Sequence, residues 1–437
     1  MKKFLTILLT VVLAVCSLGL FTGCEGDGEE KVGEVVMPAY VSDTFTQFDN
    51  TQISSDFKLG VICLHDENST YDKNFLEAVD KAKATFNLTD AQVIVKTNIP
   101  ETSACLEAAN QLVAQGCKAI FANSFGHEQF MIDAARANPT VQFYHATGTQ
   151  SKTVNVANYH TAFASIYEGR YLAGVAAGLK LKALYGDDIT ADEAKIGYVG
   201  AHPYAEVISG FTSFYLGVKS VVPNTTMKVK YTNSWYDEAA EKNAALALIA
   251  DGAKLVSGHA DSMGVPTACK EQNIPNVFYN NTTSEQTFVV ASKINWQPYF
   301  EYMLDGVMVE GASIVKDYTG TLQTGSVVVT TLGPAAAEGT QAVLDSVKAE
   351  LIAGTRKVFD TANFTVRNAK ADTSDFSKAG AITMDADGKL TAYNADIIDL
   401  GDFIGETNAI ENGIFTESSK RSAPYFDIII DGISIMA

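Results

Sequence analysis

The sequence predicts an α/β protein of two similar lobes, each built on a parallel sheet with helices packed against it. From residue 58 onward, short apolar stretches alternate with stretches of helical spacing, a pattern typical of parallel sheets. The pattern also recurs: Lys58–Ile62 has a counterpart in Lys195–Val199, 137 positions later, and Leu112–Lys118 has one in Leu248–Lys254, 136 positions later. A chain of 437 residues is too long for one ordinary core, and the offset is too long for a solenoid repeat, so two lobes follow.

The first unit of this pattern, residues 58–86, predicts a strand, a polar loop and a helix. Lys58–Leu64 is a short apolar run, and His65–Asp72 is polar. The helix is indicated by apolar residues at helical spacing, namely Phe75, Val79, Ala82 and Phe86. In open parallel sheets, ligands bind beyond the carboxyl ends of the strands, so we expect this loop to form one wall of a small-molecule cleft.

The rest of the first lobe continues the alternation. Strands are predicted near Ala91–Thr97, Lys118–Asn123 and Val141–His145, with helices at Thr102–Gln115 and up to Ala137. A further match, Phe143-Tyr144 to Phe278-Tyr279 at an offset of 135, carries the repeat to the last of these strands.

The lobes are not predicted to be consecutive. The strand-like run Phe288–Ile294 and a helix from about Pro298 to Val309 have no partner in the repeat, so we expect them to return to the first lobe. This assigns residues 57–158 plus 283–312 to the N-terminal lobe. Residues 159–282 plus 313–437 form the C-terminal lobe, which ends in an irregular tail of short strands and turns. Three crossings between the lobes would then form a hinge.

The N-terminus has the features of a secretory signal. Lys2 and Lys3 precede an apolar stretch, Phe4–Leu20, and small residues lead to Cys24. We predict a lipoprotein signal peptide at residues 1–23, a lipidated Cys24, and an acidic tether at residues 24–56. The mature protein would be anchored to the outer face of the cell membrane through this lipid. An uncleaved membrane anchor is the alternative, although the run is short for a membrane span.

Composition excludes some classes of partner. The net charge of −19 argues against a nucleic acid as the partner, because binding nucleic acid requires clustered Lys and Arg.

Four cysteines remain beyond the signal and Cys24, which are too few for a disulfide scaffold. We interpret them as buried thiols, with one bridge left open: Cys63, Cys105, Cys117 and Cys269.

Loops at equivalent places in the two lobes should face one another and offer aromatic rings with a few carboxylates and amides. That combination suits a flat polar ligand such as a nucleobase, or a sugar. Other interpretations stay open for single residues. Asp72 and Asp237 could each cap a helix, and a tryptophan such as Trp235 could serve packing alone.

Signals of catalysis are missing. No nucleophile elbow, phosphate-binding loop, zinc-protease helix or dinucleotide fingerprint occurs, and the histidines have no metal-ligand spacing. We therefore expect a binding protein rather than an enzyme, with neither a cofactor nor a metal.

Eight short segments, in order, carry a resemblance to a known family. They are Ala122–Gly126, His145–Gly148, Tyr167–Gly174, Ile196–Val199, Pro203–Val207, Asn233–Asp237, His259–Ser262 and Asn295–Tyr299. From Phe57 to about Val366 the chain resembles the basic membrane protein family of ABC-transporter substrate-binding lipoproteins, especially its Med-like branch of purine nucleoside receptors.

The resemblance implies a type I periplasmic-binding-protein fold, with two Rossmann-like lobes joined by three crossovers. It implies a monomer that captures a purine nucleoside or nucleobase for an ABC permease. Phe125 and Trp235 would sandwich the base, Asp261 and Ser124 would hydrogen-bond it, and Asn280 and Trp296 would lie near the hinge. The full set of ligand-binding candidates is Tyr71, Asp72, Ser124, Phe125, Gly126, Tyr204, Trp235, Asp261, Asn280 and Trp296.

One segment departs from the family pattern. The branch usually has a Gly-Trp-Thr-Tyr type sequence in the first loop, where this chain has Asn68-Ser69-Thr70-Tyr71. Three alternative functions stay open. They are a receptor for a sugar or another flat heterocycle such as a flavin, a nucleoside hydrolase using Asp72 or Asp261, and a sensing lipoprotein without a transporter.

Overall fold

The computed structural model describes residues 54, 56–308, 314–366, 381–395 and 407–437. The predicted signal peptide and Cys24 lie outside these residues, as does the predicted tether except for Ser54 and Asp56. The helices are α1 (Thr70–Thr85), α2 (Ser103–Ala114), α3 (Glu128–Ala137), α4 (Ile166–Tyr185), α5 (Ala205–Val221), α6 (Glu238–Ala250), α7 (Gly264–Gln272), α8 (Gln297–Met308) and α9 (Thr340–Ile352).

The strands form two large parallel sheets and two small antiparallel ones. They are β1 (Leu59–Ile62), β2 (Val93–Lys96), β3 (Ala119–Ala122), β4 (Gln142–Ala146), β5 (Tyr159–Ala164), β6 (Lys195–Gly200), β7 (Thr226–Tyr231), β8 (Leu255–His259), β9 (Asn276–Tyr279), β10 (Phe288–Ile294), β11 (Asp317–Gly320), β12 (Val327–Val329), β13 (Ala381–Met384), β14 (Leu390–Ala395), β15 (Thr407–Asn408), β16 (Ile410–Glu411), β17 (Ile414–Phe415) and β18 (Ile433–Ile435).

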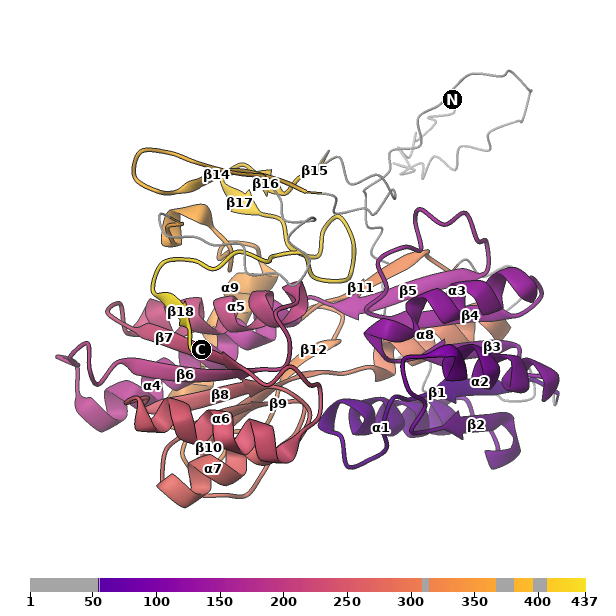
Figure 1. The fold of residues 1–437 in the computed structure, drawn as a ribbon, viewed down its shortest axis with the longest axis horizontal. Helices are drawn as coiled ribbons and strands as arrows, with labels where there is room; N and C mark the ends of the chain where they lie inside the picture. The colour runs from indigo at the N-terminus through magenta and orange to yellow at the C-terminus, as the bar shows by residue number, and fades with distance from the viewer. Residues whose placement is uncertain (1–53, 55, 309–313, 367–380, 396–406) are drawn as a thin grey trace, which may run out of the picture. The chain divides into compact units, whose positions relative to one another are not determined.

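The first lobe is built on a parallel sheet with the strand order β2-β1-β3-β4-β5-β11 among the described residues (Figure 1). Leu59 lies opposite both Val93 and Ala119, so β1 lies between β2 and β3. β1 and β3 are buried on both faces, which explains their continuous apolar sequences.

The second lobe repeats this arrangement with the order β18-β7-β6-β8-β9-β10-β12. β6 lies between β7 and β8 just as β1 lies between β2 and β3, so the repeat predicted from the sequence is confirmed. β12 runs antiparallel to β10, while β18 adds to β7 in parallel. Two lobes with parallel sheets were expected, and the sheets have that form except for the antiparallel edge strand β12.

The pairings of three strands correct the predicted lobe boundaries. β5 pairs with β4 and β11 pairs with β5, so both belong to the first lobe and not to the second. β10 pairs with β9 and therefore belongs to the second lobe, as the counterpart of β5. The prediction was wrong because a short, buried apolar strand has no pattern that identifies the sheet it joins. The helix of the same segment, α8, does return to the first lobe, where Thr85 on α1 donates a hydrogen bond to Glu301 at 2.7 Å.

Three crossings connect the lobes, at 164–166, 294–297 and 320–327, and backbone hydrogen bonds join them. The Ser165 amide donates to the Gly320 carbonyl at 2.8 Å, and the Asn295 amide donates to the Ser326 carbonyl at 2.7 Å. The three crossings are thus hydrogen-bonded to one another. Their number agrees with the prediction, but they lie at other positions in the chain than predicted.

The second lobe also contains a close helix pair. A Cβ on Gly174 of α4 would lie 2.1 Å from the Phe214 carbonyl oxygen, and one on Gly217 of α5 would lie 2.1 Å from the Tyr171 carbonyl oxygen. Only glycine permits this approach at either position. The four cysteines beyond residue 53 are free and buried, in agreement with the interpretation as core thiols.

The described residues of the C-terminal tail form short strands and turns. β13, β14 and β15 form a small antiparallel sheet, and β16 pairs with β17. Figure 1 shows these strands in orange and yellow, apart from the two large sheets. Phe359 and Phe426 stack with ring centroids 4.4 Å apart, and Phe359 also contacts the ring of Tyr167 on α4, so these rings continue the main hydrophobic core. Within the part of the chain that the structure describes, no helix is both long and apolar enough to cross a membrane.

Candidate ligand-binding site

The loop from β1 to α1 is held by a buried carboxylate. Ser69 is the N-cap of α1, and its hydroxyl donates to Asp72 at 2.7 Å. Asp72 also accepts from the His65 amide at 3.0 Å and from the Asn123 side chain at 2.7 Å. Asp72 is fully buried, so its carboxylate fixes the loops after β1 and β3.

A small cavity lies between these loops and those of the second lobe. Its volume is about 20 Å³, room for roughly one water molecule. A ligand as large as a nucleobase can enter only if the lobes separate or the side chains turn. The residues that line it come from the carboxyl ends of strands in both sheets and from the starts of α1 and α5: Leu64, Tyr71, Ser124, Phe125, Thr147, Glu206, Trp235, His259, Asp261 and Tyr279.

Two carboxylates supply the polar part of the cavity wall. Asp261 is 5% exposed, and burial raises the pKa of its carboxyl well above the usual range, with the nearby Asp72 adding to the shift. Burial also raises the pKa of Glu206 to about 7. Both groups are hydrogen-bond acceptors when ionised, so the cavity suits a ligand that presents N–H or O–H donors.

A buried arginine lies behind these carboxylates. Arg170 is 1% exposed, donates to the Gly258 carbonyl at 3.1 Å, and places its guanidinium carbon 3.8 Å from the centre of the Tyr279 ring. Its positive charge opposes the rise in the pKa of Glu206 and Asp261. Burial, followed by this charge, lowers the pKa of His259 well below its usual value, which makes the imidazole neutral.

Aromatic rings cover the mouth of the cavity. Tyr204 lies 5.7 Å from Phe125 and 5.9 Å from Trp235, measured between ring centroids, and His202 stacks on Tyr204 at 4.9 Å. Phe125 is 44% exposed although it is a large apolar side chain. These rings present flat apolar area beside the carboxylates.

Backbone and side-chain contacts join the two walls. The Thr70 amide donates to the Asp261 carbonyl at 2.8 Å, and the Asp261 amide donates to the Trp235 carbonyl at 2.8 Å. Near the hinge, the Asn74 side chain donates to Asn280 at 3.3 Å. Asn280 has a positive φ of 59° and follows β9 directly.

A second carboxylate organises the loop after β3. Glu101 accepts from the Ser124 hydroxyl at 2.5 Å and from the Gly126 amide at 2.6 Å. A Cβ on Gly126 would lie 2.6 Å from the Glu101 carboxyl carbon, so glycine is needed there. Gly126 therefore shapes the loop that presents Phe125.

The structure brings half of the predicted ligand-binding residues to the cavity wall. Tyr71, Ser124, Phe125, Trp235 and Asp261 line it. Tyr204 does not line it but contacts the lining residues Phe125 and Trp235, and Asn280 follows Tyr279 on the hinge side. Neither Asp72 nor Gly126 lines it, since they hold the surrounding loops as described above.

Trp296 requires a correction. It is 2% exposed and stacks on Phe75 with centroids 4.4 Å apart, within the aromatic core of the first lobe. It lies beside the second crossing, as expected, but does not line the cavity. Its burial agrees with the alternative that a tryptophan of this chain serves packing alone.

Several residues that line the cavity were not among the predicted ligand-binding residues. Glu206, His259 and Tyr279 are the most important, together with Leu64 and Thr147. All except Glu206 follow or end a strand at the carboxyl edge of a sheet, so strand ends were the available signal. Glu206 lies within Pro203–Val207, one of the segments that carry the family resemblance, but nothing in the sequence singled it out from its neighbours, and the structure places it in the first turn of α5.

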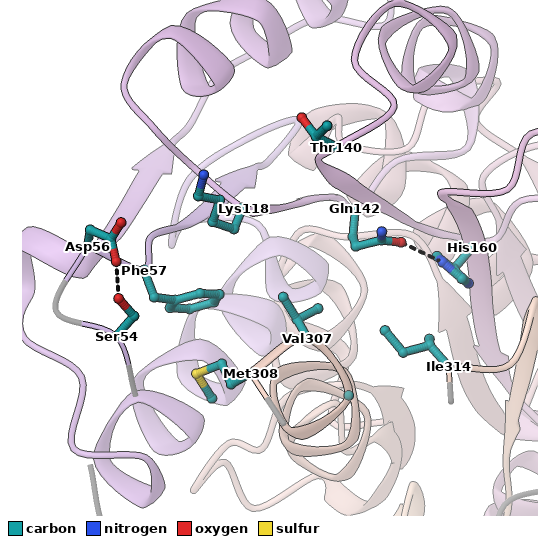
Figure 2. Close-up of a pocket in the computed structure, with 11 residues that line it drawn as sticks. Ser54, Asp56, Phe57, Lys118, Thr140, Gln142, His160, Val307, Met308 and Ile314 are labelled. Atoms are coloured by element: carbon teal, nitrogen blue, oxygen red, sulfur yellow. Dashed lines mark hydrogen bonds between the residues drawn. The ribbon is translucent and has the colours of Figure 1, made fainter. Parts of the chain in front are cut away.

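A larger cavity, about 510 Å³, lies at the amino ends of the first sheet's strands (Figure 2). His160 in its wall is hydrogen-bonded through both ring nitrogens, to Gln142 at 3.1 Å and to the Val315 carbonyl at 3.0 Å. Lys118 and Asp56 are exposed. Among the described residues, no buried polar atom in the wall of this cavity lacks a hydrogen-bond partner. Apart from its size, the cavity therefore has no feature that points to a ligand.

The described residues contain no group of His, Cys, Asp or Glu that could hold a metal ion. The arrangement between the lobes, with acceptors, aromatic faces and a neutral imidazole, has the chemistry of recognition of a small polar molecule.

Comparison with known families gives a match over most of the chain. The family model of PnrA-like ABC transporter substrate-binding proteins, named Bmp, covers residues 60–355. A purine-binding protein of Brucella abortus is 31% identical over 242 residues, which are 54% of this chain and 63% of that protein. A protein of Haloferax volcanii, whose name assigns it provisionally to glucose binding by an ABC transporter, is 30% identical over 218 residues, 49% of this chain and 52% of its own. The chain thus spans less than two thirds of these relatives.

Solved structures support the fold. A solute-binding protein of an ABC transporter system from Conexibacter woesei has a TM-score of 0.55 at 18% identity, covering 69% of this chain and 98% of its own. One from Aeropyrum pernix has a TM-score of 0.57 at 15% identity, covering 68% and 92%. These proteins share the periplasmic-binding-protein type I fold that the resemblance implied.

Proposed function

Because this chain belongs to the family of PnrA-like ABC transporter substrate-binding proteins, we propose that it captures a purine nucleoside or nucleobase between its two lobes. The observation that carries the proposal is the cavity wall, where Asp261 and Glu206 lie beside Phe125 and Trp235. The name of the Brucella abortus relative supports the same ligand class.

The chemistry of the wall fits a purine. A purine ring is flat and apolar on its faces, so it can lie against aromatic side chains, and its edge carries N–H donors for carboxylates. Ribose hydroxyls are further donors. The departure at Asn68–Tyr71 does not remove the aromatic wall of the first lobe, because Tyr71 itself lines the cavity.

We further propose that this protein delivers its ligand to a membrane permease and performs no chemistry. Proteins of its family bind substrates for ABC transporters, outside the cytoplasm. A lipidated Cys24 would hold it at the membrane as a monomer. Genes for an ATPase and a permease beside its own would support transport, whereas their absence would favour a sensing role.

A sugar is the second candidate, since the Haloferax volcanii relative is named for glucose binding. Sugars also stack on aromatic rings and donate to carboxylates. Hydrolysis of a nucleoside through Asp72 has less support, because this carboxylate is fully buried and already accepts three hydrogen bonds.

Isothermal titration calorimetry tests the proposal. Adenosine, guanosine, inosine, adenine, glucose and riboflavin would each be titrated into the full chain. We expect saturable binding of at least one purine, with the ligand recovered intact by chromatography after long incubation. Heat from glucose or riboflavin alone would contradict the purine assignment, and a cleaved nucleoside would indicate an enzyme.

A further inference from the structure

The last part of the chain contacts both lobes. The family match ends at residue 355, and the segment 417–435, which we name the C-terminal strap, lies beyond it. We propose that the C-terminal strap ties the two lobes together and limits their rotation about the hinge. This inference goes beyond the proposed function and does not depend on the identity of the ligand.

One end of the strap is fixed to the second lobe. β18 pairs with β7, and the Met227 amide donates to the Gly432 carbonyl at 2.9 Å. Gly432 has a φ of 94°, and a Cβ there would collide with the Tyr215 hydroxyl of α5, so the strap lies directly on this helix. At the other end, the Ser209 hydroxyl of α5 donates to the buried Glu417 carboxylate.

The middle of the strap is bonded to the first lobe. The Ser422 amide donates to the Asp317 carboxylate of β11 at 2.9 Å. Lys152, in the loop between β4 and β5, donates to the Lys420 carbonyl at 3.0 Å and lies 3.9 Å from Asp317. The Thr319 hydroxyl of β11 donates to the Ser418 carbonyl at 3.4 Å.

Two of these bonds, from Ser422 to Asp317 and from Thr319 to Ser418, are buried, and the bond from Lys152 is partly buried. Ser422 is 0% exposed and Asp317 is 4% exposed. Asp317 also accepts from Thr161 within the first lobe at 3.1 Å, so breaking its bond to Ser422 leaves mainly the buried Ser422 amide without a partner, which is unfavourable. The strap thus favours the lobe arrangement in which both sets of contacts are formed.

The position of Asp317 explains why rotation would disturb the strap. Asp317 begins β11, while Gly320 ends it at the hinge, a separation of about 10 Å at the usual rise per residue. A rotation of about 15°, the size of known allosteric subunit rotations, would move Asp317 by roughly 2–3 Å relative to the second lobe. Hydrogen bonds to the strap do not survive a displacement of that size.

A matched pair of lysines provides the test. Lys152 bonds the strap across the two lobes, whereas Lys316 donates to the carbonyls of Val156, Ala157 and Tyr159 within the first lobe alone. The test variant is Lys152→Ala combined with Thr319→Val, and the control is Lys316→Ala. Hydrogen–deuterium exchange would be measured on the full chain in detergent, without added ligand.

The Thr70 amide bridges the two lobes, and the Ser165 and Asn295 amides bond the crossings, so their exchange reports lobe movement. We expect the test variant to accelerate exchange at these amides about tenfold, the effect of losing roughly one charge-assisted hydrogen bond. The control should leave them at the wild-type rate. Amides inside α2 and α6 should be unchanged in both variants, which excludes general unfolding.

Faster exchange confined to residues 418–422, with Thr70, Ser165 and Asn295 at wild-type rates, would overturn the proposal. Equal acceleration by Lys316→Ala would overturn it as well, because the effect would then arise within one lobe. If calorimetry detects no purine binding, the proposed function fails but this test still stands, because the exchange experiment uses no ligand.

Discussion

At the scale of single residues, the central feature is the buried carboxylate of Asp261, which we propose contributes to recognition at the expense of stability. Asp261 is almost fully buried, and its neighbours Asp72, Glu241 and Glu206 all favour its protonated form. Such groups are typical of binding sites, where function and stability compete. Its backbone also bridges Thr70 and Trp235, so the side chain is held in place from both lobes.

We predict that Asp261→Asn weakens binding of the best purine ligand about 10- to 100-fold, the effect of losing a hydrogen bond to a charged group. The same change should raise the midpoint of thermal unfolding, because it removes a buried carboxyl group with acidic neighbours. Calorimetry and thermal denaturation measure the two effects. Asp72→Asn is the contrast: it should lower the midpoint, since Asp72 fixes two loops. Unchanged affinity in Asp261→Asn would remove Asp261 from the site.

Glu206 should make stability depend on pH. Its pKa in the folded state is about 7, above the unfolded value, so its contribution to stability is complete below about pH 4.5 and is lost as pH rises to 7. We expect Glu206→Gln to reduce this loss of unfolding free energy by about 1–3 kcal/mol. Urea denaturation between pH 4.5 and 8 measures it, with exposed Glu67→Gln as the control. Parallel curves for wild type and Glu206→Gln would contradict the assignment.

At the scale of secondary structure, the strand–loop–helix units were predictable, and their sheet partners were not. The strands at Leu59–Ile62 and Ala119–Ala122 contain no polar side chain, as is typical of strands buried on both faces. Phe288–Ile294 is also largely apolar, yet it pairs with β9 and not with the first lobe. Pairing depends on long-range contacts that the pattern of one segment does not contain.

The pair α4 and α5 allows a direct test of packing. Gly217→Ala would place a methyl group against the Tyr171 carbonyl, so we expect a loss of about 2 kcal/mol or more in unfolding free energy, as for overpacked cores. Ser220→Ala, one turn further along α5, removes only a local hydrogen bond to Gly217 and should change stability far less. Denaturant titration measures both. A loss in Gly217→Ala no larger than in Ser220→Ala would show that the helices can separate without cost.

At the scale of the whole molecule, the internal repeat predicted two lobes. The positions of the crossings between the lobes became clear only from the strand pairings in the structure. Site residues were predictable where they follow a strand end, as Ser124 and Asp261 do. Glu206 escaped because it lies inside a helix, and Trp296 was misplaced because burial against Phe75 leaves no mark in the sequence. The C-terminal strap could not be predicted, since its partners Lys152 and Asp317 are far from it along the chain.

The account depends on a purine lying against Trp235, and tryptophan fluorescence tests this directly. The chain has two tryptophans, and Trp296 is buried away from the cavity, so Trp235 should report ligand binding. We predict that inosine, adenosine, guanosine or adenine changes the fluorescence of the wild type to saturation, and that Trp235→Phe abolishes the change. An equal change in Trp235→Phe, or no change with any purine, would contradict the account.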